Sequence, residues 1–218
     1  MKLVAVCVGV AAATISVATN AGDQAELRID CSSAVTAAEQ TICADEYATF
    51  LSLGIRRQIA ALRSVRREHA ADHERWLHER DLCGNDLACL SIELEKRWNL
   101  LGRRIEMIRG VTAISGVYEY VARPEEISGD LVIAAGPDGN YGFSLVTVQL
   151  QQAHICEIWS GAAHLTEEGV VTWLDPGTGH KLQMRPAGDG RLILNLPDPL
   201  ERSFCGARAH LRGLYRLK

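Results

Sequence analysis

The seven cysteines limit the folds open to this chain more than any other feature of its sequence. Cys7 lies inside an apolar N-terminal stretch, and the other six are Cys31, Cys43, Cys83, Cys89, Cys156 and Cys205. An even number of cysteines in an exported chain is typical of structural disulfides. The spacing of Cys83 and Cys89, with no Cys-x-x-Cys nearby, does not suit zinc. We therefore expect disulfides rather than metal ligands or catalytic thiols.

The N-terminus has the order of a secretory signal peptide. Lys2 precedes an apolar run at 3–17, and small residues follow at 18–21. The run is short and poor in large side chains, which argues against a transmembrane span. We expect cleavage near Ala21, loss of Cys7, and a periplasmic or secreted mature chain without a membrane span; the alternative is an uncleaved anchor. Without Lys2 the net charge of −4 becomes −5, which does not suggest a nucleic-acid partner.

The hydrophobic period changes near residue 110. Apolar residues recur at helical spacing over 33–109, a stretch without proline, whereas all six prolines and short alternating apolar runs come later. This change predicts an α+β protein of two domains. The expected boundaries are a signal peptide at 1–21, a helical domain at 22–110 and a β domain at 111–218.

The first half predicts an all-α hairpin or bundle stapled by its four cysteines. Thr36 and Glu39 match a capping box that opens a short helix ending near Cys43. A second helix begins at Asp45, breaks or bends near residue 70 and resumes at Trp76. Its apolar stripe is Tyr47, Leu51, Ile55, Ile59, Leu62 and Val65. After a turn at 83–86, the last helix has the stripe Leu87, Leu90, Leu94, Trp98, Leu101, Ile105 and Ile108, and it stops at Gly110.

The second half predicts an eight-stranded antiparallel barrel or curved meander. The expected strands are 116–122, 129–135, 141–150, 153–162, 169–174, 180–185, 191–196 and 207–216, with turn residues at 137–140, 176–179 and 188–190. Cys156 falls in a central strand and Cys205 precedes the last. We expect these two to be bonded, because the other four lie in the helical half. Those four allow three connectivities.

Three groups of residues have side chains of the kinds found in chemical sites. The histidines His69, His73 and His78 lie on or near one helix, but the segment lacks the His-Glu-x-x-His order, and a polar helix surface is the preferred interpretation. The arginines Arg56, Arg57, Arg63, Arg66 and Arg67 share a helix with acidic neighbours. They indicate a solvated face more than a surface for an acidic partner. Ser144, His154, His164 and Asp175 lack a nucleophile elbow, so we expect no catalytic residues, no metal and no cofactor.

Trp76, Arg80 and Asp81 form a separate motif. Trp76 and Arg80 are four residues apart, so the guanidinium can stack on the indole. Asp81 can pair with a neighbouring helix. We expect these residues to support the helices.

Two stretches of the helical half resemble the N-terminal domain of LprI-type lysozyme inhibitors, over residues 30–108. They are Cys31-Ser-Ser-Ala-Val-Thr-Ala-Ala-Glu-Gln-Thr-Ile-Cys43-Ala-Asp and Trp76-Leu-x-x-Arg80-Asp81-x-Cys83-Gly-Asn-Asp-x-x-Cys89-Leu. Ser52 and Ile59 stand where that family often has Asp and Tyr. The β half is only loosely similar to the small barrels of other periplasmic inhibitors, whose Ser-Gly-x-x-Tyr motif differs from Ser115-Gly116-Val117-Tyr118.

The resemblance implies a small extracytoplasmic helical domain and, for some members, inhibition of c-type lysozyme. We therefore expect a non-enzymatic binding protein with a protein partner, a c-type lysozyme, that protects the cell wall by occlusion. An acidic chain would also be steered toward a basic lysozyme. The alternative is an envelope module whose barrel binds a small ligand or an envelope partner, which needs an open barrel interior.

Overall fold

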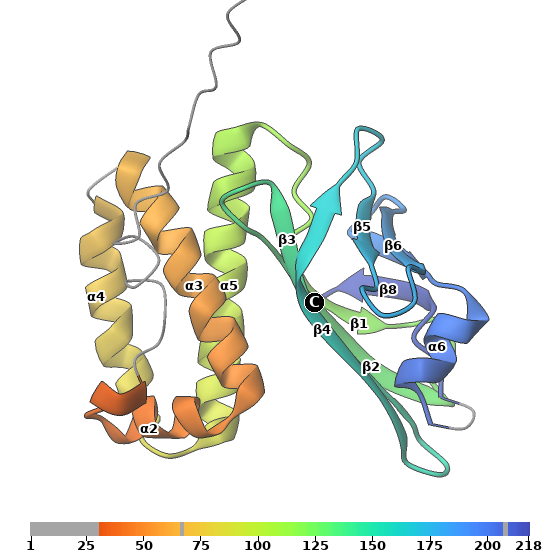
Figure 1. Cartoon of the computed structure of the whole chain (residues 1–218), viewed down its shortest axis with the longest axis horizontal. Helices are drawn as coiled ribbons and strands as arrows, with labels where there is room; N and C mark the ends of the chain where they lie inside the picture. Colours follow the sequence, from red (N-terminus) through yellow and green to blue (C-terminus); the bar gives the residue numbers. More distant parts are fainter. Residues whose placement is uncertain (1–30, 66–67, 207–208) are drawn as a thin grey trace, which may run out of the picture.

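The chain folds as a helical half followed by a closed antiparallel barrel (Figure 1). In a computed structural model, the described residues are 31–65, 68–206 and 209–218, without the side chains of residues 64–70. The expected signal peptide at 1–21 lies outside these residues. The predicted α+β fold class is confirmed, and the β half is a closed barrel rather than an open meander.

The helical half begins with a short 3-10 helix, η1 (Cys31–Ser33), and α2 (Ala37–Ala44), whose capping box between Thr36 and Glu39 is formed in both directions. Helix α3 (Glu46–Val65) starts after Asp45, whose carboxylate accepts the Ala48 N–H at 2.8 Å. Helix α4 (Glu68–Asp81) is a separate helix and runs unbroken through residue 70, so the prediction that the helix breaks near residue 70 and resumes at Trp76 was wrong: the new helix already begins at Glu68.

Helix α5 (Leu87–Arg109) is the longest helix of the described chain. Asp86 caps its first turn by accepting the Cys89 N–H, and Gly110 ends it at a φ of 66°, which favours glycine. The middle of the predicted stripe is buried, but Leu87 and Ile108 are exposed, contrary to the expectation that they face the core. Both lie in terminal turns of the helix, where the apolar spacing continues although their side chains are not covered.

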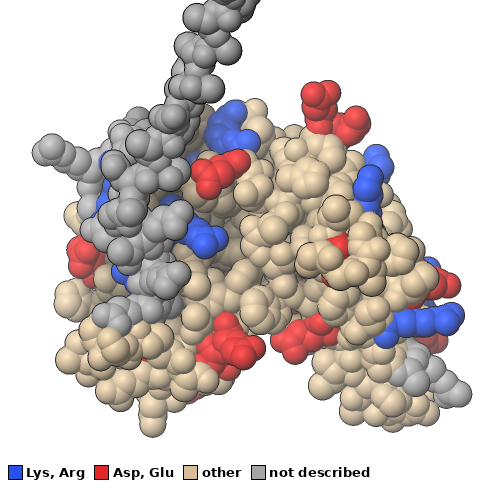
Figure 2. All heavy atoms as spheres, viewed as in Figure 1, with Lys and Arg blue, Asp and Glu red and all other residues tan. Residues whose placement is uncertain are grey.

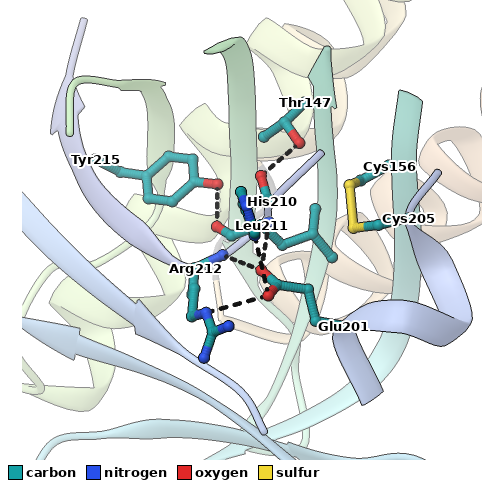
Figure 3. The surroundings of a disulfide bond; sticks show 8 residues. All are labelled: Thr147, Cys156, Glu201, Cys205, His210, Leu211, Arg212 and Tyr215. Carbon is teal, nitrogen blue, oxygen red and sulfur yellow. Dashed lines mark hydrogen bonds and ion pairs between the residues drawn. A yellow bond between two sulfur atoms is a disulfide. The ribbon is translucent and has the colours of Figure 1, made fainter. Parts of the chain in front are cut away.

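The structure contains three disulfides, Cys31–Cys43, Cys83–Cys89 and Cys156–Cys205. The first two settle the connectivity that the sequence left open, and each links residues close in the chain. The third is the expected bond between the central strand and the segment before the last strand (Figure 3). Three disulfides are typical of proteins from an oxidising compartment.

The barrel strands follow one another in sequence order, and the last pairs with the first. They are β1 (Gly116–Tyr120), β2 (Ile127–Ala135), β3 (Asn140–Gln149), β4 (His154–Leu165), β5 (Val171–Leu174), β6 (Lys181–Pro186), β7 (Arg191–Asn195) and β8 (Gly213–Leu217). The predicted strand 207–216 is wrong at its start, because β8 begins only at Gly213. The sequence analysis also missed helix α6 (Asp198–Phe204), although Pro199 lies in its first turn, where proline is well tolerated.

The two strands that close the barrel begin in the same way. Tyr118 donates its hydroxyl to the carbonyl of residue 114 at 2.7 Å, and Tyr215 donates to that of residue 211 at 2.6 Å. In both places a buried glutamate of a helix accepts hydrogen bonds from two backbone N–H groups that lie just before the strand. Glu106 of α5 accepts those of residues 114 and 115, and Glu201 of α6 accepts those of residues 211 and 212 (Figure 3). The segments Ile-Ser-Gly-Val-Tyr and Leu-Arg-Gly-Leu-Tyr are thus a structural repeat.

The helical half packs directly on the barrel, and their buried residues form one hydrophobic core. Helix α5 stands between α3 and the sheet and contacts β1 and β2 (Figure 1). A Cβ at Gly102 would lie 2.9 Å from the backbone N of Ala135, so α5 needs glycine there. Gln58 of α3 donates to the carbonyl of Ala135 at 2.8 Å and to that of Trp98 at 3.2 Å. The end of β2 and the start of β3, where these contacts fall, are therefore buried on their outer side as well.

Candidate functional site

Trp76 lies at the centre of the motif that carries the family resemblance. Its ring is 7% exposed, with the guanidinium of Arg80 at 5.7 Å and that of Arg97 at 5.4 Å from the ring centroid. Arg80 also bonds Asp81 at 2.5 Å, so Asp81 pairs with its own helix rather than with a neighbouring one. The Cys83–Cys89 disulfide comes just after Asp81 in the chain and links the turn behind α4 to the first turn of α5. These contacts brace α4 against α5.

Of the three histidines, the structure describes the side chains of His73 and His78. His73 is buried and stacks on Trp76 with ring centroids 5.4 Å apart. Burial, reinforced by Arg97, Arg63 and Arg80, lowers its pKa to about 4. His78 is exposed, and the side chain of His69 lies outside the described residues. Across the described residues, no group of three His, Cys, Asp or Glu side chains is placed to hold a metal ion.

The arginine face of α3 borders a pocket of about 820 Å³ that is lined mostly by the helical half and also by Pro137 and Asp138 of the turn between β2 and β3. Arg57 is exposed, and Arg63 faces Glu74 of α4 at 3.7 Å. Ile55, Ile59 and Trp76 contribute apolar surface to the same pocket. Arg66 and Arg67 lie outside the described side chains, so the full predicted cluster is not seen.

The four residues considered for hydrolysis lie in different surroundings. Ser144 is buried on the outer face of β3, and His154, at the start of β4, contacts Gln152 at 3.2 Å. Asp175 accepts from the hydroxyl and N–H of Thr178 within a turn, and these bonds lower its pKa. His164 is exposed on β4 opposite Thr172. None of these groups hydrogen-bonds another among the described residues.

Aromatic rings fill the barrel interior. Phe143 and Trp173 lie 5.9 Å apart, Trp173 and Phe204 6.3 Å, and Tyr120 and Tyr215 5.3 Å between ring centroids. Burial raises the pKa of Tyr215 well above its ordinary value. A packed interior gives no support to a small-ligand site inside the barrel.

The sequence analysis missed a surface where the helices meet the barrel. We call it the acid–aromatic face, and it comprises Tyr47, Phe50, Glu95, Glu157 and Trp159. The Phe50 and Trp159 rings lie 5.1 Å apart between centroids, so α3 contacts the outer side of β4. Tyr47 donates its hydroxyl to Glu95 of α5 at 2.8 Å. Trp159 keeps 39% of its surface exposed, which leaves an aromatic surface open to solvent beside the two glutamates.

The two glutamates of this face differ in their surroundings. Burial raises the pKa of Glu95, Asp130 raises it further, and the Tyr47 bond and Lys218 oppose the rise. Glu157 is exposed and forms no ion pair with any described residue. By contrast, the neighbouring carboxylate of Asp130 pairs with Lys218 at 2.7 Å. The face therefore holds acidic groups that no described cation neutralises fully.

One signal in the sequence pointed toward this face. The β4 positions Ile155, Glu157 and Trp159 alternate with buried positions, so two large apolar side chains lie on the outward side. The position of Trp159 beside α3 depends on packing against Phe50, which lies more than 100 residues earlier in the sequence. The spacing of apolar residues along β4 could not predict that packing.

Comparison with known proteins gives no assignment: no family model, no curated protein and no solved structure matches this chain. In the described residues, no helix combines the length and apolar character needed to cross a bilayer. What defines the molecule is its architecture, a disulfide-stapled helical unit fused to a closed eight-stranded barrel.

Proposed function

We propose that this chain is an exported, non-enzymatic binding protein, periplasmic or secreted, that inhibits a c-type lysozyme by occlusion and so protects the bacterial wall. The observation that carries the proposal is the arrangement of the resemblance motifs. Their four cysteines pair as Cys31–Cys43 and Cys83–Cys89, and Trp76, Arg80 and Asp81 are joined by stacking and an ion pair. The motif residues thus form one braced unit.

Occlusion needs a rigid, complementary surface and no chemistry. The disulfides and the shared core supply rigidity, which limits the ordering cost of association. The expected mature charge of −5 favours encounter with a basic enzyme and makes association weaken as salt rises. The aromatic packing of Phe143 and Trp173 favours this proposal over the alternative of a ligand-binding barrel, which needs an open interior.

The test is a lysozyme assay with purified protein of residues 22–218 carrying its disulfides. A c-type and a g-type enzyme are each assayed on peptidoglycan with the protein in micromolar excess. We expect inhibition of the c-type enzyme that saturates with protein concentration and weakens with added salt. A reduced and alkylated sample serves as the control. Unchanged activity of both enzymes would refute the proposal.

A further inference from the structure

We propose that the acid–aromatic face is a docking surface for a basic protein, and that it receives a lysine or arginine side chain of that partner between Trp159 and the glutamates. This inference rests on the proposed function only where it takes lysozyme as the partner that contacts the face. The chemistry of the face supports it independently, because it calls for a cationic partner whichever protein carries the charge.

The first support is exposure. Helix α5 packs on β1 and β2, whereas α3 reaches the outer row of β4 through the contact of Phe50 with Trp159, which leaves Ile155 55% exposed and Trp159 39% exposed. Figure 2 shows a hollow open between the helical half and the barrel, with acidic side chains on both of its walls. Exposed large apolar groups such as Ile155 and Trp159 are typical of contact surfaces.

The second support is the pairing of aromatic rings with carboxylates. A guanidinium or ammonium group is attracted to the face of an indole and forms charge-assisted hydrogen bonds with carboxylates. Trp159 offers the first interaction and Glu157 the second, since Glu157 forms no ion pair with a described residue. A neutral sugar can stack on the same ring, but it leaves the carboxylate charge uncompensated.

The third support is the burial of Glu95 behind this rim. Its charged form is disfavoured by burial, and the Tyr47 hydroxyl donates a hydrogen bond to it at 2.8 Å. A partner cation placed in the hollow would compensate that charge and lower the pKa again. Binding is therefore expected to release protons at mildly acidic pH and to tighten as pH rises.

The experiment uses the full mature chain and three variants. Glu157→Gln alters an exposed charge, Trp159→Phe keeps an aromatic ring against Phe50, and Glu167→Gln is the charge-matched control in the exposed turn after β4. Binding is measured by calorimetry at low and at physiological salt against a c-type lysozyme, deca-lysine, fully acetylated deca-lysine and a chito-oligosaccharide. Circular dichroism verifies the fold of each variant.

We expect deca-lysine to bind and acetylated deca-lysine not to bind. Glu157→Gln should weaken binding about tenfold and Glu167→Gln less than about twofold, because a charge at the contact matters more than one outside it. Trp159→Phe should weaken binding by a smaller factor, since Phe is a poorer cation–π partner than Trp. The same ranking should hold for lysozyme.

The outcomes separate the two proposals. If lysozyme is inhibited but all three variants behave like the wild type, the docking face is wrong and the inhibitory function stands. If lysozyme is ignored but deca-lysine binds with the expected ranking, the face stands and the function fails. Equal weakening by Glu157→Gln and Glu167→Gln, or preferred binding of the neutral sugar, overturns the docking proposal, as does the absence of any binding.

Discussion

Glu95 lies where burial disfavours its charged form, although the acid–aromatic face would use that form. A raised folded pKa means that the folded state holds the proton more tightly than the unfolded chain does. Stability from this group is therefore present at low pH and is lost as pH rises from about 4.5 through the raised pKa. Glutamine is neutral throughout and can still accept the Tyr47 hydroxyl. Glu95→Gln should raise the free energy of unfolding at pH 7.

Urea unfolding of wild type and Glu95→Gln at pH 4 and pH 7 measures this effect. We expect similar stability at pH 4 and a more stable variant at pH 7. The same variant should bind deca-lysine more weakly. Gain of stability with loss of binding is the pattern of a residue retained for function. A variant less stable than wild type at pH 7 would show that the charge of Glu95 supports the fold.

His73 gives a pH dependence of the opposite direction. Its pKa is lowered to about 4, so the unfolded chain takes up a proton near pH 6.5 that the folded state resists. Stability from this group is complete above pH 6.5 and falls as pH drops toward 4. Arg97, Arg63 and Arg80 oppose the charged form, and Asp72 favours it. The loss over this window should reach up to about 3 kcal/mol.

The variant His73→Phe keeps a ring against Trp76 and removes the titration. Nδ1 of His73 has no hydrogen-bond partner among the described residues, so the exchange breaks no bond at that atom. The difference in unfolding free energy between variant and wild type should grow in favour of the variant from pH 7 to pH 4.5. A constant difference across this range would exclude His73 as the source of the acid sensitivity.

At the scale of elements, Glu106 and Glu201 hold the backbone just before the two strands that close the barrel, β1 and β8. Glu106 is fully buried and accepts the N–H groups of Ile114 and Ser115. Glu106→Gln replaces one acceptor by a donor and removes the charge, which should lower stability by about 2–3 kcal/mol. Glu93→Gln on the exposed side of α5 should cost less than about 1 kcal/mol. Equal thermal shifts for the two variants would contradict this assignment.

The disulfides should differ in their contribution according to the loop they close. Cys156 and Cys205 are 49 residues apart, which corresponds to about 4 kcal/mol in the chain-entropy treatment. Cys83 and Cys89 are 6 apart, which corresponds to about 2 kcal/mol. Chemical unfolding of the paired Cys→Ala variants should reproduce this order. A larger loss for the short loop would point to local packing around Trp76 as the main factor.

The sequence predicted helices and strands well where the hydrophobic period continues over many residues. It predicted them poorly where tertiary contacts determine the structure. The stripe from Leu90 to Ile105 and the alternation in β3 were sufficient to define a helix and a strand. Helix α6 was missed because its seven residues are too few for a helical period to appear. The acid–aromatic face was missed because Phe50 and Trp159 meet only after the helical half has packed on the barrel.

At the scale of the whole molecule, Trp98 joins the two halves. Its ring, 3% exposed, lies between two glycines, one on α3 and one on β3. A Cβ at Gly54 would lie 2.5 Å from the indole nitrogen, and one at Gly142 would lie 2.4 Å from the six-membered ring. The same side chain therefore packs against a helix and a strand, which makes the halves mutually dependent. We expect them to unfold in one cooperative transition.

Gly142→Ala tests this dependence. The added methyl group meets a buried ring that has little room to move, so the variant should lose about 1–3 kcal/mol. Gly161→Ala on β4 is the matched control, since its Cβ would lie 3.8 Å from the nearest described atom, in Phe50. Thermal unfolding is followed by far-UV circular dichroism, which reports the helices, and by tryptophan fluorescence.

Both signals should shift to lower temperature together in Gly142→Ala and should barely move in Gly161→Ala. Because one ring couples the halves, a defect on the barrel side must also destabilise the helices. If the helical signal kept its wild-type midpoint while fluorescence shifted, the halves would be independent folding units. The docking face, to which both halves contribute residues, would then be lost when the less stable half unfolds, so cation binding should disappear at the lower of the two midpoints.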